Sequence, residues 1–485
     1  MKSAQNNPYA PLQYGALEKV TDSVYLFRNI VNSSIVVGDR GVAVIDTQVN
    51  RRMACRVLQA VRRITDKPIL YAINTHYHWD HTNGNVIFHD EGAIVISREM
   101  TKGFMVNRAP RQKAFLRSRG FELGDDPYLP DETFQLETEL DLGNQPLHLV
   151  HLGKAETDDA TAVLIPNEGC IVSGDTIMTG SFPIFGQPVM NEGLMGNQDW
   201  INTIDELRSH KPDHVLPGHG PLAHDTEIDL LIKIEEYFLS EVRKRIDSSM
   251  ELCELLADLE NSLPDWITRI AEVWGTPRYA ALRVYRGLID SPEPGWQHFK
   301  PSVVPSADPR EVEENTANLD SFEGYRQAAA ELGEGGDIGL RIAVLREATR
   351  QYPEDPASWT ALAKTLNQES RIVSSVLEKG DFFSEARTAI QTALELDPEY
   401  APALLLLGQT LITIAYRNGD DPATGLAYIH RALNLPLTDT QIAQAYFSIG
   451  LANRTDGAES KAKAALAKAI KADPKFMPAQ LANMA

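Results

Sequence analysis

The chain has 485 residues, and its 67 acidic and 46 basic side chains give a formal net charge of −21 at pH 7. This charge repels nucleic acids and anionic membrane surfaces, so we expect neither as a partner. The 43% hydrophobic and 23% charged content is typical of globular proteins and excludes the disordered and collagen-like classes. At roughly 150 residues per domain, the length suggests about three domains.

The cysteines and the N-terminus predict a cytoplasmic protein. Cys55, Cys170 and Cys253 are scattered and odd in number, so they form neither a disulfide framework nor a Cys-x-x-Cys metal pair. Residues 1–15 lack the apolar core of a signal peptide, and no apolar stretch is long enough to span a membrane. We therefore expect a reducing compartment, unless a cleaved leader is missing from the sequence.

Short β-rich runs alternate with helical patterns in residues 1–223. The predicted strands are residues 24–27, 34–37, 42–45 and 69–73. Residues 51–65 have apolar positions at helical spacing and predict a helix. Strands that alternate with helices indicate an α/β domain. After residue 223 the pattern changes to long helical segments such as residues 228–246, and no further strand is expected.

The remainder of the chain divides into a helical region, residues 224–309, and a repeat region, residues 310–485. Residues 291–309 contain five prolines and predict a linker. Beyond it, a pattern with a small residue at its centre recurs from Trp359, Leu404 and Tyr446, 45 and 42 residues apart. It resembles the tetratricopeptide repeat, whose ideal period is about 34. The repeats either form a groove for a protein partner or pack only against the rest of the protein or a second subunit.

Four candidate metal ligands, His76, His78, Asp80 and His81, follow the strand predicted at residues 69–73. Alternation at the strand end points His76 and His78 the same way, and the following turn presents Asp80 and His81 to a second position a few ångströms away. This arrangement suits two neighbouring metal ions. The alternative is a chance cluster of surface histidines, which gives no reason for a polar cluster directly after a buried strand.

The spacing His-x-His-x-Asp-His resembles the signature of the metallo-β-lactamase superfamily. The resemblance implies an αβ/βα sandwich of two mixed sheets with outer helices, and metal ions held by loops at one end. It assigns Asp175, in a Ser-Gly-Asp-Thr loop, as the bridging carboxylate, and His219 as a ligand of the second metal with Asp80 and His81. Asp46, at the end of the strand predicted at residues 42–45, occupies a position that orients the site in this superfamily.

One loop departs from the common pattern of the superfamily. Most members have Gly-His-Thr or Gly-His-Ser where this chain has residues 153–159, and alignment on Thr157 puts Glu156 in place of the histidine. A glutamate there resembles the alkylsulfatase branch. We therefore predict Glu156 as the ligand that joins His76 and His78. His151, just upstream, is the alternative ligand.

Other segments bear on the substrate and the partner. Residues 272–288 resemble the alkylsulfatase dimerisation domain, which implies a homodimer. Residues 181–188 lack the arginine thought to hold the sulfate in that branch, and repeats replace its sterol-carrier-like domain. The basic stretch in residues 101–120 either attracts an anionic substrate or pairs with the acidic residues of 122–132. Its cations are Lys102, Arg108, Arg111, Lys113, Arg117 and Arg119.

Together, these resemblances imply a metal-dependent hydrolase of a small-molecule ester, with two Zn²⁺ or other divalent transition metals per chain. The metals make a hydroxide available near neutral pH and polarise the ester. Asp80 guides the proton of the attacking water, and Asp175 bridges the metals. A sulfuric ester is the leading substrate, and a carboxylic ester, lactone or amide is the alternative. A different hypothesis is an interaction scaffold with a vestigial metal domain, against which the complete ligand set argues.

Overall fold

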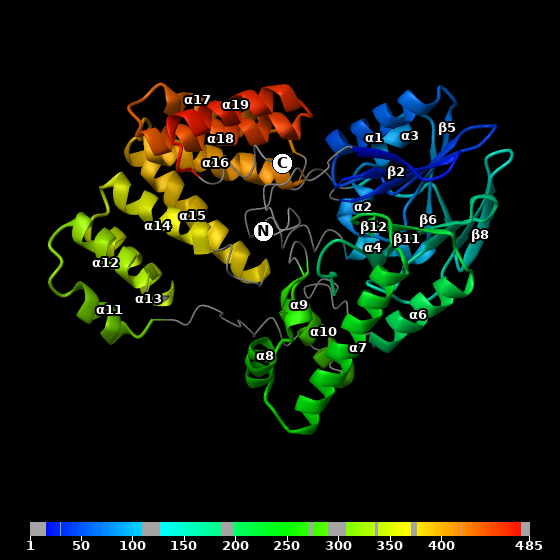
Figure 1. Ribbon diagram of the computed structural model, residues 1–485, viewed down its shortest axis with the longest axis horizontal. Coiled ribbons are helices and arrows are strands. Elements are labelled where there is room, and N and C mark those ends of the chain that lie inside the picture. The colour runs from blue at the N-terminus through cyan, green and yellow to red at the C-terminus, as the bar shows by residue number, and fades with distance from the viewer. Residues whose placement is uncertain are drawn as a thin grey trace. The chain divides into compact units, whose positions relative to one another are not determined.

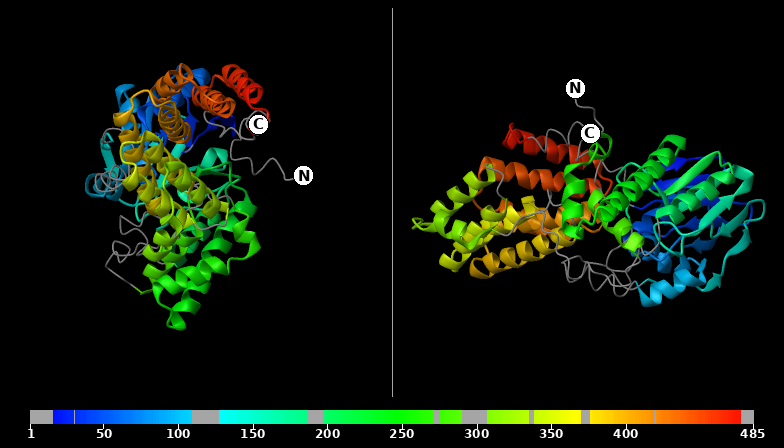
Figure 2. Two further views of the ribbon diagram at one scale, coloured as in Figure 1. Left: turned by 90° about the vertical axis from the view of Figure 1, so that its left-hand side faces the viewer. Right: turned by 90° about the horizontal axis from the view of Figure 1, so that it is seen from below.

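The computed structural model describes residues 16–29, 31–108, 127–185, 197–270, 275–289, 307–334, 338–369, 376–418 and 420–476. They belong to two compact units, one within residues 16–289 and the other within residues 307–476. Every strand of the described residues lies in the first unit, and the second is helical (Figure 1, Figure 2). Residues 1–15 and most of the predicted linker, residues 291–306, lie outside this description.

The first unit begins with a seven-stranded sheet in which the strands lie in chain order. The first four pair antiparallel, and β4 to β7 pair parallel, so the sheet is mixed as expected. The four strands predicted from the sequence are confirmed to within one residue. The strands are β1 (Ala16–Lys19), β2 (Val24–Arg28), β3 (Ser33–Val37), β4 (Val42–Ile45), β5 (Ile69–Ile73), β6 (Ile94–Arg98) and β7 (Glu132–Phe134).

A second, five-stranded sheet has the order β12-β11-β10-β9-β8. Only β11 and β12 pair parallel, and the other neighbours are antiparallel. The strands are β8 (Glu137–Asp141), β9 (Pro146–Val150), β10 (Ala162–Ile165), β11 (Cys170–Met178) and β12 (His214–His219). Both sheets are therefore mixed.

The two sheets pack face to face with helices on both outer faces, which confirms the αβ/βα sandwich. In β4, Ala43 and Ile45 contribute to the core between the sheets, while Val42 and Val44 pack under α1 (Arg51–Ile64). A strand with period 2 buries both sets of side chains when both of its faces are covered. Helix α3 (Asn85–Asp90) covers the same outer face, and α6 (Asn197–Ser209) and α7 (Asp225–Asp247) cover the second sheet.

Helices continue the first unit beyond the sandwich, as the change of pattern near residue 223 predicts. They are α7, α8 (Leu252–Asn261), α9 (Asp265–Thr268) and α10 (Pro277–Ile289). Phe182 and Phe185, from the loop after β11, are buried among these helices against Phe238. A Cβ atom at Gly275 would overlap the carbonyl oxygen of Pro183, so the start of α10 and this loop are in close contact. Residues 272–274, part of the segment that resembles a dimerisation domain, lie outside the described residues.

The second unit consists of helices that pack in consecutive pairs. Trp359, Leu404 and Tyr446, which begin the repeated pattern, lie in α14, α16 and α18. A Cβ atom at Gly408 would lie 2.8 Å from the side chain of Ile429, so α16 and α17 approach closely there. The helices are α11 (Pro309–Thr316), α12 (Phe322–Glu334), α13 (Ile338–Gln351), α14 (Pro356–Glu369), α15 (Val376–Leu396), α16 (Ala401–Asn418), α17 (Ala423–Leu433), α18 (Asp439–Thr455) and α19 (Glu459–Ala472).

The structure also bears on the cysteines and on membrane-spanning helices. Cys55 and Cys170 are free thiols, and the side chain of Cys253 lies outside the described residues. Across the part of the chain that the structure describes, no helix combines the length and apolar character needed to cross a bilayer.

Candidate functional site

The predicted ligands meet at one edge of the sandwich because all of them except Asp175, which lies within a strand, lie at or beyond the end of a strand. His76 and His78 follow β5, and Asp80 and His81 lie on the short helix α2 (Trp79–Thr82) rather than on an open turn. The other predicted ligands are Glu156 between β9 and β10, Asp175 within β11 and His219 at the end of β12. Residues far apart in the sequence are thus brought together by the two sheets.

The seven side chains form two groups, in each of which the donor atoms lie within 4.8 Å of one another. The first group is His76, His78, Glu156 and Asp175, and the second is Asp80, His81 and His219. Asp175 adjoins both groups. One of its oxygens lies 3.4 Å from Nε2 of His81, and the other lies 3.3 Å from Nε2 of His219 and 3.8 Å from Nε2 of His76. Asp175 therefore occupies the position of a bridging carboxylate.

Asp46 fixes the orientation of two histidines, as its position at the end of β4 suggested. The Thr75 hydroxyl donates its only proton to Oδ2 of Asp46 at 2.8 Å, so Nδ1 of His76, 3.1 Å from that hydroxyl, must be the donor. Nδ1 of His81 also donates to Oδ2 of Asp46, at 2.8 Å. Because both Nδ1 atoms carry protons, the Nε2 atoms of both rings are left to face the two groups.

Asp46 has a backbone φ of 61°, in the left-handed region that aspartate tolerates better than most residues. Its oxygens are held by Thr75, whose backbone N–H donates to Oδ1 at 2.9 Å, and its carbonyl accepts from Ser33 at 2.6 Å. The surrounding hydrogen bonds thus compensate for a conformation of higher energy, as is common at functional sites.

The loop that carries His219 is tied to the first sheet by Asn32, a residue that sequence reasoning did not identify. The Asn32 side chain donates to the carbonyls of Pro217 and Gly220 at 2.9 and 2.8 Å, and its backbone N–H donates to Gly218 at 2.8 Å. A Cβ atom at Gly218 would overlap Oδ1 of Asp175. Only glycine therefore lets this loop approach the bridging carboxylate so closely.

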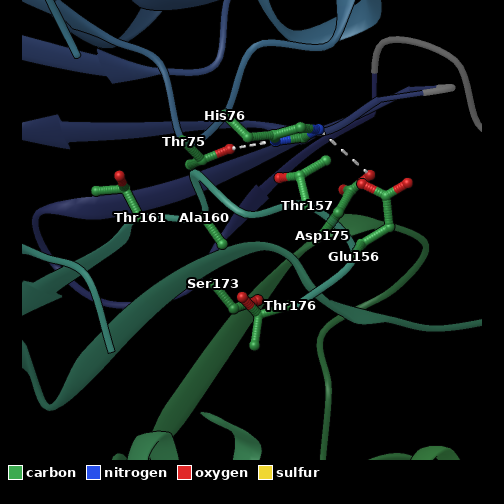
Figure 3. A pocket seen from close by; sticks show the side chains of 9 residues that line it. All are labelled: Thr75, His76, Glu156, Thr157, Ala160, Thr161, Ser173, Asp175 and Thr176. Atoms are coloured by element: carbon green, nitrogen blue, oxygen red, sulfur yellow. Dashed lines mark hydrogen bonds and ion pairs between the residues drawn. The ribbon is translucent and has the colours of Figure 1, made fainter. Parts of the chain in front are cut away.

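Glu156 lies in the first group, and its alternative, His151, lies in neither. Oε2 of Glu156 is 3.3 Å from Nδ1 of His78, and the Glu156 side chain is only 1% exposed. Figure 3 shows Glu156 beside Asp175 and facing the ring of His76, across a pocket lined also by Thr157. The ring of His151 instead donates from Nδ1 to the carbonyl of Ala160 at 2.7 Å.

Burial and mutual charge set the protonation states of the site. Burial lowers the pKa of His78 to about 4 and that of His76 well below its ordinary value of 6.5. Burial, and then the charge of Asp175, raises the pKa of Glu156 well above 4.5. Burial also disfavours the charge on Asp175, but His219 and His81 lower the pKa of its carboxyl well below 3.8. His76 and His78 are therefore neutral near pH 7, as metal ligation requires.

The donor atoms fit a divalent metal. Several buried atoms that could bind a metal have no hydrogen-bond partner among the described residues, although buried polar groups nearly always have one. They are Nε2 of His76 and His81, both carboxylate oxygens of Glu156 and Oδ1 of Asp175. Imidazole nitrogen and carboxylate oxygen are ligands of zinc and of other divalent transition metals. A positive ion between these groups would also neutralise the carboxylates that now repel one another.

The structure also places part of the basic stretch of residues 101–120. Lys102 donates to the carbonyl of Pro130 at 2.6 Å, and Arg108 lies 3.7 Å from a carboxylate oxygen of Asp158. Both cations therefore have partners, although neither partner is one of the acidic side chains of residues 122–132. The predicted cations Arg111, Lys113, Arg117 and Arg119 lie outside the described residues, as do residues 186–188 of the loop that lacks an arginine.

Two further residues, on helices, bond the backbone of the site, and no sequence pattern singled out either of them. The guanidinium of Arg283, in α10, donates to the carbonyls of Ala155 and Glu156. The indole Nε1 of Trp200, in α6, donates to the carbonyl of Thr176 at 2.9 Å.

Comparison with known proteins shows what the sandwich is similar to. Residues 26–219 match the family model of the metallo-beta-lactamase superfamily. A linear primary-alkylsulfatase from a Pseudomonas species is 20% identical over 317 residues, 56% of this chain and 57% of the relative. A type 2 metallo-beta-lactamase from Elizabethkingia meningoseptica is 23% identical over 235 residues, 46% of this chain and 85% of the relative. The chain thus spans little more than half the length of the matched alkylsulfatase.

Among solved structures, the stereoselective inverting sec-alkylsulfatase Pisa1 from a Pseudomonas species is similar with a TM-score of 0.56 and 13% sequence identity. The similarity covers 82% of this chain and 71% of that chain. It therefore extends beyond the sandwich into the helical part. At this level of identity, the similarity shows a common fold.

Proposed function

We propose that this member of the metallo-beta-lactamase superfamily is a hydrolase that binds two divalent metal ions, zinc in the first instance, at the two groups of side chains. The observation that supports this most directly is the convergence of the predicted ligands into two groups, with Asp175 of the first group also lying beside two histidines of the second. Two metals bound there supply a water of lowered pKa and polarise the bond to be broken. The chain therefore needs no serine or cysteine nucleophile.

The protein's own residues divide the work in this proposal. His76, His78 and Glu156 would hold one metal, Asp80, His81 and His219 would hold the other, and Asp175 would be a ligand of both. The Asp80 side chain is 17% exposed, whereas those of His81 and Asp175 are 0% and 4% exposed. Asp80 is thus the ligand that water reaches, and its carboxylate is placed to accept the proton of the attacking water.

A sulfuric ester with a modest organic group is the substrate we propose first. Glu156 in the first group supports this choice, because a carboxylate at this position resembles the alkylsulfatase branch. The similarity to a linear primary-alkylsulfatase and to the fold of a sec-alkylsulfatase points the same way.

A carboxylic ester, lactone or amide is the second candidate. It is favoured by the loop of residues 181–188, which contains no basic residue to hold a sulfate. In addition, Lys102 and Arg108 of the basic stretch already have partners. The ester, lactone or amide group of such a substrate is uncharged, so it would need no such cation.

One panel of assays tests both candidates. Zinc-loaded protein is assayed with alkyl sulfates, carboxylic esters and lactones, beside a sample stripped with a chelator. We expect turnover that is lost with the chelator and restored by zinc. Release of sulfate supports the first substrate, and turnover of carboxylic substrates alone supports the second. Metal-free protein that hydrolyses as fast as the zinc form would refute a metal-dependent hydrolase.

For the second unit, we propose tetratricopeptide-like repeats, which form a groove for a protein partner or pack only against the rest of the protein or a second subunit, and for the whole chain we propose a homodimer. The consecutive helix pairs and the close approach at Gly408 support the repeats. Light scattering of the full chain tests the dimer, and a monomeric mass at micromolar concentration would contradict it. Stoichiometric capture of a partner by protein with negligible turnover would favour the scaffold hypothesis instead.

A further inference from the structure

Arg283 connects the helical part of the first unit to a loop of the metal centre. It lies on α10, and its side chain is 3% exposed. Its Nη2 atom donates to the carbonyl of Ala155 at 2.8 Å, and its Nη1 atom donates to the carbonyl of Glu156 at 3.3 Å. A buried guanidinium therefore forms hydrogen bonds with the backbone at Glu156, whose side chain belongs to the first group.

Trp200 extends this connection to strand β11, beside Asp175. The guanidinium carbon of Arg283 lies 5.0 Å from the centre of the Trp200 ring, within the range of a cation–π interaction. The indole Nε1 of Trp200 donates to the carbonyl of Thr176, the residue after Asp175. Two helices that carry none of the predicted ligands thus bond the backbone beside both carboxylates of the first group.

We propose that Arg283 is a positioning residue which, with Trp200, holds the loop of Glu156 and the strand of Asp175 in the geometry for metal ligation. This inference rests on the proposed two-metal centre and adds that α10 is required to complete it. Sandwich residues 26–219 supply all the ligands. On this proposal, however, they do not by themselves fix the position of Glu156.

The chemistry of the guanidinium suits this role. Its planar fork spans two adjacent carbonyls, which the single ammonium of lysine does not do with the same geometry. Its positive charge also opposes the charge repulsion between Glu156 and Asp175, whose carboxylates belong to the same group. A carboxylate ligand in a buried site needs such compensation more than a neutral histidine ligand does.

The test compares Arg283→Met with Arg278→Met in the full chain. Arg278 lies on the same helix, and its side chain is 11% exposed, but its Nη1 atom bonds Oε2 of Glu260 at 2.6 Å instead of a ligand loop. Chelator-stripped proteins are titrated with Zn²⁺ in competition with a coloured chelator, and bound zinc is counted by elemental analysis. Thermal unfolding without metal measures the structural cost of each change.

We expect Arg283→Met to weaken one of the two zinc sites by roughly 10- to 100-fold, the usual effect of removing a group that orients a ligand. Arg278→Met should bind two zinc ions like the wild type, even where it lowers the unfolding temperature as much. If Arg283→Met fails to fold, Arg283→Lys is tested in its place, and we expect it to show a smaller loss of zinc affinity at the same site.

Two results separate this inference from the proposed function. Two sites of unchanged affinity in Arg283→Met, or in the folded Arg283→Lys variant if the first does not fold, would overturn the inference and leave the metal centre intact. Wild-type protein that binds no zinc would overturn both. An equal loss of zinc affinity in Arg278→Met and Arg283→Met would show that damage to α10 in general, and not the loss of the hydrogen bonds to Ala155 and Glu156, weakens zinc binding.

Discussion

Replacing Glu156 with glutamine removes one carboxylate from the first metal group while nearly keeping the shape of the side chain. The effect on stability should change sign with the metal. Without metal, burial and the charge of Asp175 raise the pKa of Glu156, so its ionised form destabilises the folded protein at neutral pH. Glu156→Gln should then be at least as stable as the wild type in the presence of a chelator.

With metal, the same change should be destabilising. Glu156 is one of four donors in its group. Zinc sites with four ligands bind with roughly 10–16 kcal/mol, so each ligand contributes about 2.5–4 kcal/mol, or roughly 100- to 1,000-fold in affinity. The glutamine oxygen keeps part of this, which places the expected loss near 100-fold. At saturating zinc, a loss of that size lowers the free energy of unfolding by about 2.7 kcal/mol.

Urea unfolding in zinc and in chelator, together with a zinc count, measures both signs. His151→Ala is the matched control, because His151 bonds Ala160 and lies in neither group. It should keep two zinc ions. Two tightly bound ions in Glu156→Gln, or the loss of one ion in His151→Ala, would refute the ligand assignment.

Three further predictions concern groups around the ligands. Asp46→Asn removes the charge that fixes the ring of His81, so zinc affinity should fall about 10- to 100-fold in the same titration; an unchanged affinity would contradict this role. Gly218→Ala forces Asp175 to move and should weaken both zinc sites, whereas loss of one site alone would argue against a shared carboxylate. Burial raises the pKa of Asp159 from 3.8 to about 6, so its stabilising contribution is lost as pH rises between these values. In chelator, Asp159→Asn should therefore match the wild type near pH 4 and exceed it by up to about 3 kcal/mol above pH 6, and an equal difference at both pH values would refute this.

The local elements, and the candidate ligands that follow them, could be predicted from the amino-acid sequence alone. Strand β5 and the ligands His76, His78, Asp80 and His81 are adjacent in the chain, so alternation and spacing already indicated a paired arrangement. The choice of Glu156 over His151 came from the resemblance to a known loop pattern. The apolar run of β4 and the helical spacing of apolar positions in α1 predicted these elements, but not what they pack against.

The contacts that surround these predicted ligands could not be predicted, because they join residues far apart in the chain. Asn32 bonds a loop 185 residues away, and Arg283 bonds the carbonyl of Glu156 127 residues away. In the sequence, Arg283 is an ordinary polar position in an amphipathic helix, because a hydrogen bond to a backbone carbonyl requires no particular residue type at the acceptor. The candidate ligands can thus be recognised in short sequence segments, whereas their orientation depends on contacts that form only when the sheets and helices pack.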